Sequence, residues 1–237
     1  MTTLTGALLL DAWDRAAGAG TLARPLSLLA AAYPDRPEGT WLDVSLSDLE
    51  IELLRLRRVT FGDTIRGTLP CGSCGSSLEF AVSASSMLDQ LTRLRPLAPA
   101  VWDAGGVAFS MRPVTTRDLL AVSSAPAPRR ALLARCVEVE PETARDAVFE
   151  SENRALEEFD RLNEGAESWT ALPCPACSVV ERVSLDIAHF VWLEVRHAAM
   201  ALLRQVHELA GAYGWSEAEI LAMNGRRRAM YLEMART

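Results

Sequence analysis

The sequence predicts a mainly helical α+β fold that carries a small four-cysteine β unit assembled from two distant hairpins. Two observations lead to this class. Apolar residues follow helical spacing over residues 4–62 and again over 186–236. Two short segments, 63–83 and 167–186, instead alternate apolar and polar residues on either side of a Cys-x-x-Cys pair. With 237 residues, of which 49% are hydrophobic, the chain can bury a large core, and we expect a single compact domain over 1–237.

The N-terminal part contains three predicted helices. The first two are separated by the glycine-rich stretch 18–20, and Pro34 stops the second. The third helix begins after an N-cap at Ser45 or Ser47 and ends at Gly62. Its apolar face carries Leu49, Leu53 and Leu56, and its polar face carries Arg55, Arg57 and Arg58.

The middle of the chain alternates short elements with turn signals. We expect a short helix over 87–94, a hairpin about the glycines 105 and 106, a helix capped by Thr115 or Thr116, and a polar helix from Pro141 to about Leu162. The stretch SSAPAPRR at 123–130 is the most linker-like segment, although it is too short to separate independent domains.

The C-terminal part is helical. An amphipathic helix of about seven turns, at 3.6 residues per turn, runs from Asp186 to Ala212 and is closed by Gly211 or Gly214. Ser216 and Glu219 then form a capping-box pattern that opens a short helix.

The two cysteine pairs share one pattern, LPCGSC beginning at Leu69 and LPCPAC beginning at Leu172. Each Cys-x-x-Cys turn supplies two thiolates that face one point, and four thiolates satisfy the tetrahedral preference of Zn²⁺. We therefore predict that Cys71, Cys74, Cys174 and Cys177 bind one structural zinc ion in a zinc-ribbon-like unit. Ninety-nine residues separate the pairs, far more than in an ordinary zinc ribbon, so tertiary structure must close the site.

Other interpretations of the cysteines and histidines are open. The pairs could be unmetallated thiols or reducible disulfides, although a redox pair usually opens a helix after a strand, and here β-like alternation follows each pair. Cys136 is expected to be a buried small apolar residue. His189, His197 and His207 lie on one predicted helix without the four-residue spacing of helical metal ligands.

Charge and motif content exclude several classes of function. A net charge of -7 and a pI near 5.1 argue against nucleic acid or an anionic membrane as the main partner, because both attract a positive surface. The first apolar run lacks a basic leader and is interrupted by Asp11 and Asp14, and no run approaches the roughly 18 apolar residues of a membrane span, so we expect a cytoplasmic protein. Because the common catalytic motifs HExxH, GxSxG, GxxxxGK[ST] and GxGxxG are missing from the sequence, we do not expect an enzyme.

Several segments together resemble one known family. They are a leucine-rich N-terminus, a CxxC before an LEF strand, FSMRPVTTRDLLAV, CPAC before SLDIAHFVWLEV, and the ending LLRQVHELAGAYGWSEAEILAMNGRRRAMYLEM. The order and content of these segments resemble the T4-type baseplate hub assembly chaperones, which are encoded with contractile phage tails and extracellular contractile injection systems. The resemblance covers most of the chain, and its most specific part is the C-terminal segment.

The resemblance implies a non-enzymatic assembly chaperone or adaptor that binds baseplate, hub or spike proteins. A permanent minor structural subunit of the baseplate is the alternative, and a zinc-ribbon regulator that binds nucleic acid is a more distant one. Under the family interpretation, the residues expected to dock a partner are Trp215, Ile220, Leu221, Arg226, Arg227, Arg228 and Tyr231. Packing among the C-terminal helices would explain the same residues equally well.

Overall fold

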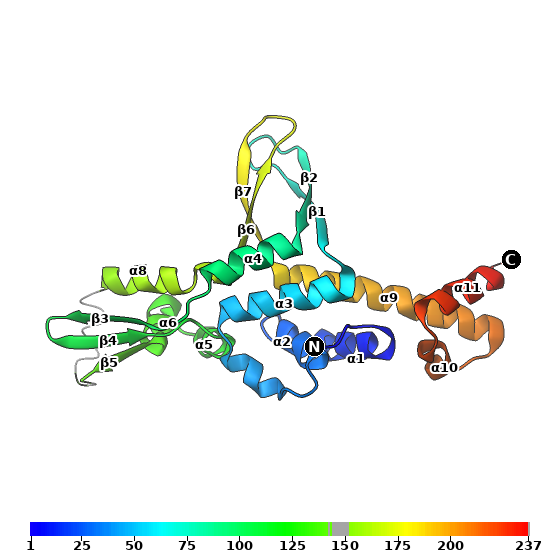
Figure 1. Cartoon of the computed structure of the whole chain (residues 1–237), viewed down its shortest axis with the longest axis horizontal. Coiled ribbons are helices and arrows are strands. Elements are labelled where there is room, and N and C mark those ends of the chain that lie inside the picture. Colours follow the sequence, from blue (N-terminus) through cyan, green and yellow to red (C-terminus); the bar gives the residue numbers. More distant parts are fainter. Residues whose placement is uncertain (142, 144–151, 237) are drawn as a thin grey trace.

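The fold is mainly helical α+β, as the sequence predicts, and the molecule is elongated (Figure 1). The computed structural model describes residues 1–141, 143 and 152–236. A helical body lies at the centre, and two cysteine-bearing hairpins project from it. A lobe with a three-stranded sheet lies at one end and two short C-terminal helices lie at the other. Within the described part of the chain, none of the helices combines the length and the apolar character needed to cross a lipid bilayer.

The body consists of helices from both ends of the chain. They are α1 (Gly6–Gly18), α2 (Arg24–Ala32), the 3-10 helix η1 (Glu38–Asp43), α3 (Leu46–Phe61) and α9 (Ile187–Tyr213). The Ser45 side chain accepts a hydrogen bond from the Asp48 N–H, so Ser45 is the cap of α3. Asp186 caps α9 in the same way, and α9 ends at Gly214, whose φ of 69° is left-handed. The local signals in the sequence therefore fix the ends of the two main helices.

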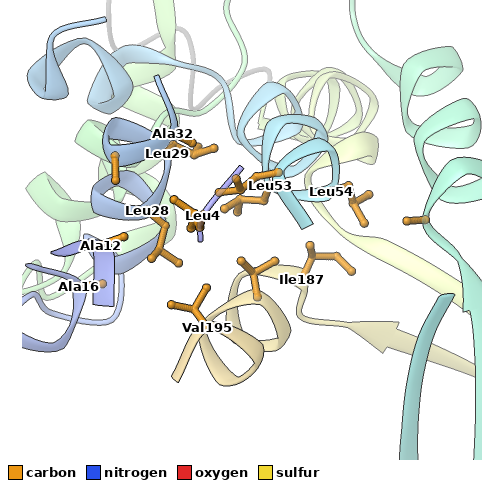
Figure 2. Packing of buried hydrophobic residues seen from close by; sticks show 14 of the residues in the cluster. Leu4, Ala12, Ala16, Leu28, Leu29, Ala32, Leu53, Leu54, Ile187 and Val195 are labelled. Atoms are coloured by element: carbon orange, nitrogen blue, oxygen red, sulfur yellow. The ribbon is translucent and has the colours of Figure 1, made fainter. Parts of the chain in front are cut away.

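The main hydrophobic core lies where α9 packs against α1, α2 and α3 (Figure 2). Leu28 and Leu29 of α2, Leu53 of α3 and Val195 of α9 are all at most 1% exposed. Burying a side chain of this size stabilises a fold by roughly 1.5–3 kcal/mol. Because α9 supplies one side of this core, the N-terminal helices cannot bury their apolar faces without the C-terminal part of the chain.

One arginine joins α3 to α9 and to the first hairpin. The sequence pattern assigns Arg57, with Arg55, to the polar face of α3. The structure corrects this assignment, because the Arg55 side chain is 47% exposed whereas Arg57 is only 3% exposed. Its Nε and Nη2 donate to the two carboxylate oxygens of Glu194 on α9, at 3.0 and 2.7 Å. It also donates to the carbonyl oxygens of Gly62 and Thr64, at 2.6 and 2.7 Å. A planar guanidinium can serve all these acceptors at once, which the single nitrogen of a lysine cannot.

Arg57→Lys is therefore expected to destabilise the protein by about 2–3 kcal/mol, since buried acceptors lose charged donors. Urea unfolding followed by circular dichroism measures the change. Arg55→Lys is the matched control, because Arg55 lies on the same helix with its side chain 47% exposed and pairs only locally with Glu52. That exchange is expected to cost less than about 0.5 kcal/mol. Equal effects of the two substitutions would contradict the role given to Arg57.

The lobe is built around the antiparallel sheet β3-β4-β5, with a second hydrophobic core. Its elements are β3 (Ala100–Ala104), β4 (Val107–Met111), α5 (Thr116–Val122), α6 (Pro128–Cys136), β5 (Val137–Glu140), α8 (Glu152–Leu162) and η3 (Glu164–Ala166). The predicted hairpin is confirmed: both Gly105 and Gly106 adopt positive φ, at 63° and 81°, as a tight primed turn requires.

The sequence predictions for the rest of the lobe need correction in two places. The segment 123–130 is not simply a linker, because α6 begins at Pro128, whose fixed φ suits the first turn of a helix. Strand β5 was not predicted. The polar helix predicted over 141–162 is confirmed as α8 from Glu152 onward, and residues 142 and 144–151 lie outside the described residues.

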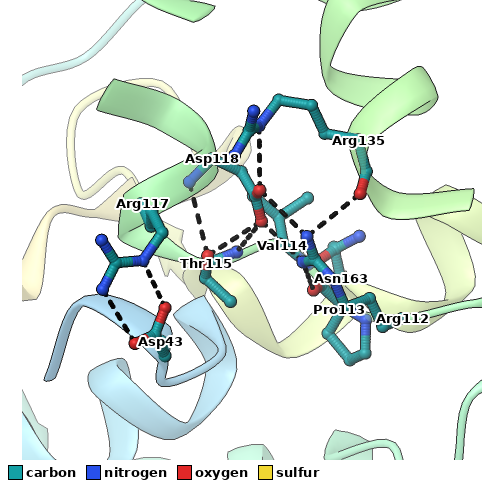
Figure 3. Close-up of polar contacts among 9 residues, drawn as sticks. All are labelled: Asp43, Arg112, Pro113, Val114, Thr115, Arg117, Asp118, Arg135 and Asn163. Atoms are coloured by element: carbon teal, nitrogen blue, oxygen red, sulfur yellow. Dashed lines mark hydrogen bonds and ion pairs between the residues drawn. The ribbon is translucent and has the colours of Figure 1, made fainter. Parts of the chain in front are cut away.

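A polar network closes the lobe against the body (Figure 3). Thr115, one of the two predicted caps, forms a full capping box with Asp118 on α5. Asp118 is only 1% exposed and also pairs with Arg112, at 2.6 Å, and with Arg135, at 3.1 Å. Nearby, Asp43 and Arg117 form an exposed ion pair between η1 and α5. Asp118 and Asp43 both pair with arginine, but Asp118 is buried and binds two arginines, whereas Asp43 is exposed and, among the described residues, binds one.

The chain ends in α10 (Glu217–Ala222) and α11 (Gly225–Ala235), which pack on the end of α9. The predicted capping box is confirmed, since Ser216 and Glu219 bond each other's backbone N–H groups. A small third core joins these helices to α9, with Val206, Leu209, Ile220 and Leu232 buried in it.

Candidate metal centre

Two hairpins of the same design carry the four cysteines. The first joins β1 (Thr64–Pro70) to β2 (Ser77–Ser83), and the second joins β6 (Ser168–Pro173) to β7 (Val180–Leu185). Figure 1 shows the two hairpins side by side. Helix α4 (Ala84–Leu94) follows the first hairpin, and α9 follows the second. The segment between the two hairpins runs from α4 to η3, so the hairpins are neighbours in space although they are far apart in the sequence.

The first hairpin rests on α9 through an aromatic pair. The ring of Phe80 on β2 lies across the opposite strand at Gly67, where an added Cβ would come within 2.4 Å of the ring. On the helix side, Phe80 meets Phe190 edge to face, with centroids 6.1 Å apart. Glycine at position 67 thus leaves room for the Phe80 ring. Through its contact with Phe190, this ring holds the first hairpin against α9.

The two cysteine turns have the same backbone hydrogen bonds. The N–H of Cys71 donates to the Ser76 carbonyl, and the N–H of Gly75 donates back to the Cys71 carbonyl, both at 2.8 Å. In the second turn, Cys174 pairs with Val179, and Ser178 donates to Cys174, again both at 2.8 Å. The repeated sequence pattern therefore forms a repeated three-dimensional turn.

The residue after the second cysteine of each pair has a left-handed backbone. It is Gly75 in the first turn, with φ of 72°, and Ser178 in the second, with φ of 62°. Ser178 is the one non-glycine residue with positive φ within the described ranges. A side chain in this region costs roughly 1–2 kcal/mol, which glycine avoids.

Ser178→Gly is therefore expected to stabilise the protein by about 0.5–1 kcal/mol, because the relief of strain exceeds the extra entropy of glycine in the unfolded chain. Gly75→Ser, the reverse exchange at the equivalent place, is expected to destabilise by a similar amount. The shift in melting temperature measures both. Two shifts of the same sign would contradict the equivalence of the turns.

The four sulfurs converge as the sequence predicts. All four Sγ atoms lie within 4.8 Å of one another. The contacts run between the hairpins: Cys71 Sγ lies 3.8 Å from Cys177 Sγ, and Cys74 Sγ lies 3.7 Å from Cys174 Sγ. A disulfide would need about 2.05 Å. By contrast, sulfurs bound at about 2.3 Å to one tetrahedral ion lie about 3.8 Å apart, so the four cysteines fit a metal ion.

The burial of the ligands is uneven. Cys71 and Cys174, the first cysteine of each pair, are both 2% exposed, Cys177 is half-buried and Cys74 is exposed. Leu78 lies buried beside the two inner sulfurs in a small apolar cluster. The ion site is therefore open to solvent on one side and shielded on the other.

Glu181 on β7 is a neighbour of the site that the sequence did not reveal. The Cys71 thiol donates to a Glu181 carboxylate oxygen at 3.0 Å, and the Ser73 N–H donates to the same oxygen at 3.1 Å. The contact with Glu181 raises the pKa of Cys71 to about 12. Hydrogen bonds from Ser76 instead lower the pKa of Cys74 to about 6. Since metals bind thiolates, Cys71 must give up this proton when an ion binds.

The remaining cysteine and the histidines lie apart from the site. Cys136 is 1% exposed in the core of the lobe, where burial raises its pKa to about 11, so the prediction of a buried apolar residue is confirmed. His189, His197 and His207 lie exposed along α9. None of them belongs to the ligand cluster found among the described residues.

The predicted docking residues occupy two environments at the C-terminal end. Trp215 and Tyr231 are partly exposed. Trp215 stacks on Tyr213, with ring centres 4.5 Å apart, and Tyr231 meets Tyr213 edge to face. Ile220 is 0% exposed, so its side chain is part of the third core and is not available to a partner. Leu221 packs on two of the hydrophobic cores.

The arginine triplet divides in the same way. Arg226 and Arg227 are exposed on α11. Arg228 is partly buried and donates to the Met223 carbonyl and to Gln205, which ties α11 to α9. Two of the three arginines therefore remain available at the surface.

No known protein family, curated protein or solved structure matches this chain. The geometry of the cysteine unit and the residue patterns themselves are the basis for the function proposed below.

Proposed function

We propose that the four cysteines bind a structural Zn²⁺ ion. The convergence of four sulfurs in cross-hairpin pairs at 3.7 and 3.8 Å supports this most directly. Four thiolates are soft ligands, and a tetrahedral set of them is typical of structural zinc. With four protein ligands the coordination shell is complete, so the metal has no open position for water or substrate. We place the protein in the cytoplasm, where thiols stay reduced and ready to bind metal.

We further propose that the protein is a non-enzymatic chaperone or adaptor in the assembly of a phage-tail-like contractile injection system. Its partners would be baseplate, hub or spike proteins. The sequence segments that resemble baseplate hub assembly chaperones support this proposal. The shape is compatible with it, because a metal-fastened hairpin unit, a side lobe and a C-terminal helical end each present a separate surface (Figure 1).

The C-terminal end is the surface that we expect to dock a partner. Met230 and Met234 on α11 are 53% and 54% exposed, and they lie in one stripe with the exposed Arg226. Methionine adapts its shape to a partner, and arginine is enriched at the centres of interfaces. The aromatic cluster of Tyr213, Trp215 and Tyr231 lies at the same end.

Co-purification tests the adaptor function. The tagged chain, expressed from its native gene cluster, is expected to retain one or more baseplate proteins. A variant with Arg226→Glu and Arg227→Glu is expected to lose them. The matched control carries Arg15→Glu and Arg93→Glu, which reverse the same charges at exposed sites on α1 and α4. Equal retention by both variants would place the interface elsewhere, and no retention by the wild-type protein would contradict the proposal.

Mature particles distinguish the proposed role from its alternative. An assembly factor is absent from purified particles, whereas a permanent minor subunit is present in fixed stoichiometry. A regulator that binds nucleic acid is disfavoured by the net charge of -7. It would instead show strongly salt-dependent binding to DNA or RNA.

A further inference from the structure

A pocket separate from the cysteine unit lies between α2, α3, α5 and the start of α9. Its volume is about 240 Å³. Most of its wall is apolar, with Leu49 and Leu53 from α3, Leu119 from α5 and Trp192 from α9. A mainly apolar pocket with a few converging polar groups is the usual form of a small-ligand site.

Glu50 is the buried acid of this pocket. It is 9% exposed, and its Oε1 accepts a hydrogen bond from the Ser168 hydroxyl at 2.9 Å. Within the described residues, no ion pair joins it to a basic side chain. The charges that act on it come from Asp186 and Glu167, which are also carboxylates. Burial, followed by this repulsion, raises the pKa of Glu50 to about 8.

Two further polar atoms of the pocket wall are buried and lack a hydrogen-bond partner in the described structure. They are the hydroxyl oxygen of Thr116 on α5 and Nε of Arg24 on α2. The Arg24 guanidinium lies over the Trp192 ring, with its central carbon 5.0 Å from the ring centre. Buried polar groups are nearly always paired, so the unpaired Thr116 hydroxyl oxygen in the cavity wall indicates a missing partner.

We propose that this pocket binds a primary alkylammonium group. The ammonium would lie at Glu50, where it pairs with the carboxylate once the Glu50 carboxyl has released its proton, and it can also donate to the Thr116 hydroxyl oxygen. Its alkyl stem would lie against the leucines and Trp192. An ammonium has three donors and no acceptor, which suits this pair of oxygens. The chain contains no lysine, so the amine comes from another molecule, either a lysine side chain of a polypeptide or a free amine.

Titration of the full-length protein with three five-carbon probes tests the proposal: pentylammonium, 1-pentanol and pentanoate, followed by calorimetry and NMR. Only pentylammonium is expected to bind saturably. Because the pKa of Glu50 is raised, the binding of pentylammonium is expected to release the proton of the Glu50 carboxyl. The measured heat of binding then depends on the ionisation enthalpy of the buffer. Nα-acetyl-lysine methylamide and 1,5-diaminopentane then distinguish a peptide source from a free amine, and binding of either supports the proposal.

Three variants make the test specific. Glu50→Gln keeps an acceptor for Ser168 but removes the charge, and it is expected to weaken pentylammonium binding at least tenfold. Glu79→Gln, the same change at an exposed site on β2, is expected to have no effect. Arg24→Met removes a competing cation while keeping an apolar stem over Trp192, and it is expected to strengthen binding a few-fold.

Three results would overturn the proposal. They are binding of 1-pentanol as tight as that of pentylammonium, pentanoate binding that Arg24→Met abolishes, and no effect of Glu50→Gln in a variant whose NMR spectrum shows the native fold. The proposal does not depend on the adaptor function, since neither the four cysteines nor the C-terminal end lines this pocket.

Discussion

Cys174→Ser is expected to abolish metal binding and to disorder the paired hairpins. Cys174 is the buried cysteine of the second hairpin, and its sulfur contacts that of Cys74. A cross-link that closes a loop of about 100 residues contributes roughly 4–5 kcal/mol through loop entropy alone. Metal analysis is expected to give one zinc per wild-type chain and almost none in the variant.

Hydrogen exchange of backbone amides identifies which segments lose structure in Cys174→Ser. Amides of β1, β2, β6 and β7 are expected to lose protection in Cys174→Ser, while those of α3 and α9 keep theirs, because the body has its own core. Cys136→Ala is the control, since it also alters a buried cysteine but lies outside the cluster. It is expected to retain one zinc per chain. Full zinc content in Cys174→Ser, or none in the wild-type protein, would refute the metal site.

Asp118→Ala is expected to destabilise the protein by about 3–5 kcal/mol, the usual cost of removing one partner from a buried ion pair. Asp118 serves two arginines, Arg112 and Arg135, and it also caps α5 through Thr115. Without it, α5, α6 and the end of β4 lose their common anchor (Figure 3). Urea unfolding measures the loss.

The pH dependence of stability gives a second readout of Asp118. Burial alone would raise its pKa, but hydrogen bonds from Arg112 and Thr115 outweigh burial and hold the pKa well below the usual range. A carboxyl whose pKa is lowered by folding stabilises the fold fully above its unfolded pKa of about 3.9. This stabilisation is lost as the pH falls below that value, and Asp118→Ala is expected to show less loss between about pH 5 and 3.

Asp43→Ala is the matched control for this prediction. Asp43 also pairs with an arginine, Arg117, but both side chains are more than half exposed. An exposed pair of this kind contributes less than about 1 kcal/mol. If Asp43→Ala and Asp118→Ala lower the free energy of unfolding equally, burial is not the reason that Asp118→Ala destabilises the protein.

The features that sequence analysis predicted correctly are determined by residues that are close together in the sequence. The helix cap at Thr115, the capping box at Ser216 and the glycine turn at residues 105 and 106 each depend on a few consecutive residues. The convergence of the four cysteines was predictable because their turn pattern occurs twice. Each copy of the turn directs two sulfurs toward one point. Because a structural zinc ion takes four ligands, the two pairs were predicted to meet.

The features that it missed depend on contacts between distant segments. The burial of Arg57 follows from Glu194, which lies on α9, and the contact of Glu181 with Cys71 joins opposite hairpins. Neither residue stands out from other charged positions in its own helix or strand. Glu50 likewise lies on a predicted helix, and its burial depends on distant segments that include α5, β6 and α9.

The position of α9 has a consequence for biosynthesis. While a ribosome makes this protein, α1, α2 and α3 emerge long before the helix that covers their apolar faces. Cys71 and Cys74 likewise precede the second pair by about 100 residues, so a metal ion held by all four cysteines could be bound only after Cys177 has been made. The nascent chain must therefore be kept from aggregating until α9 has emerged, and the body can fold only after that.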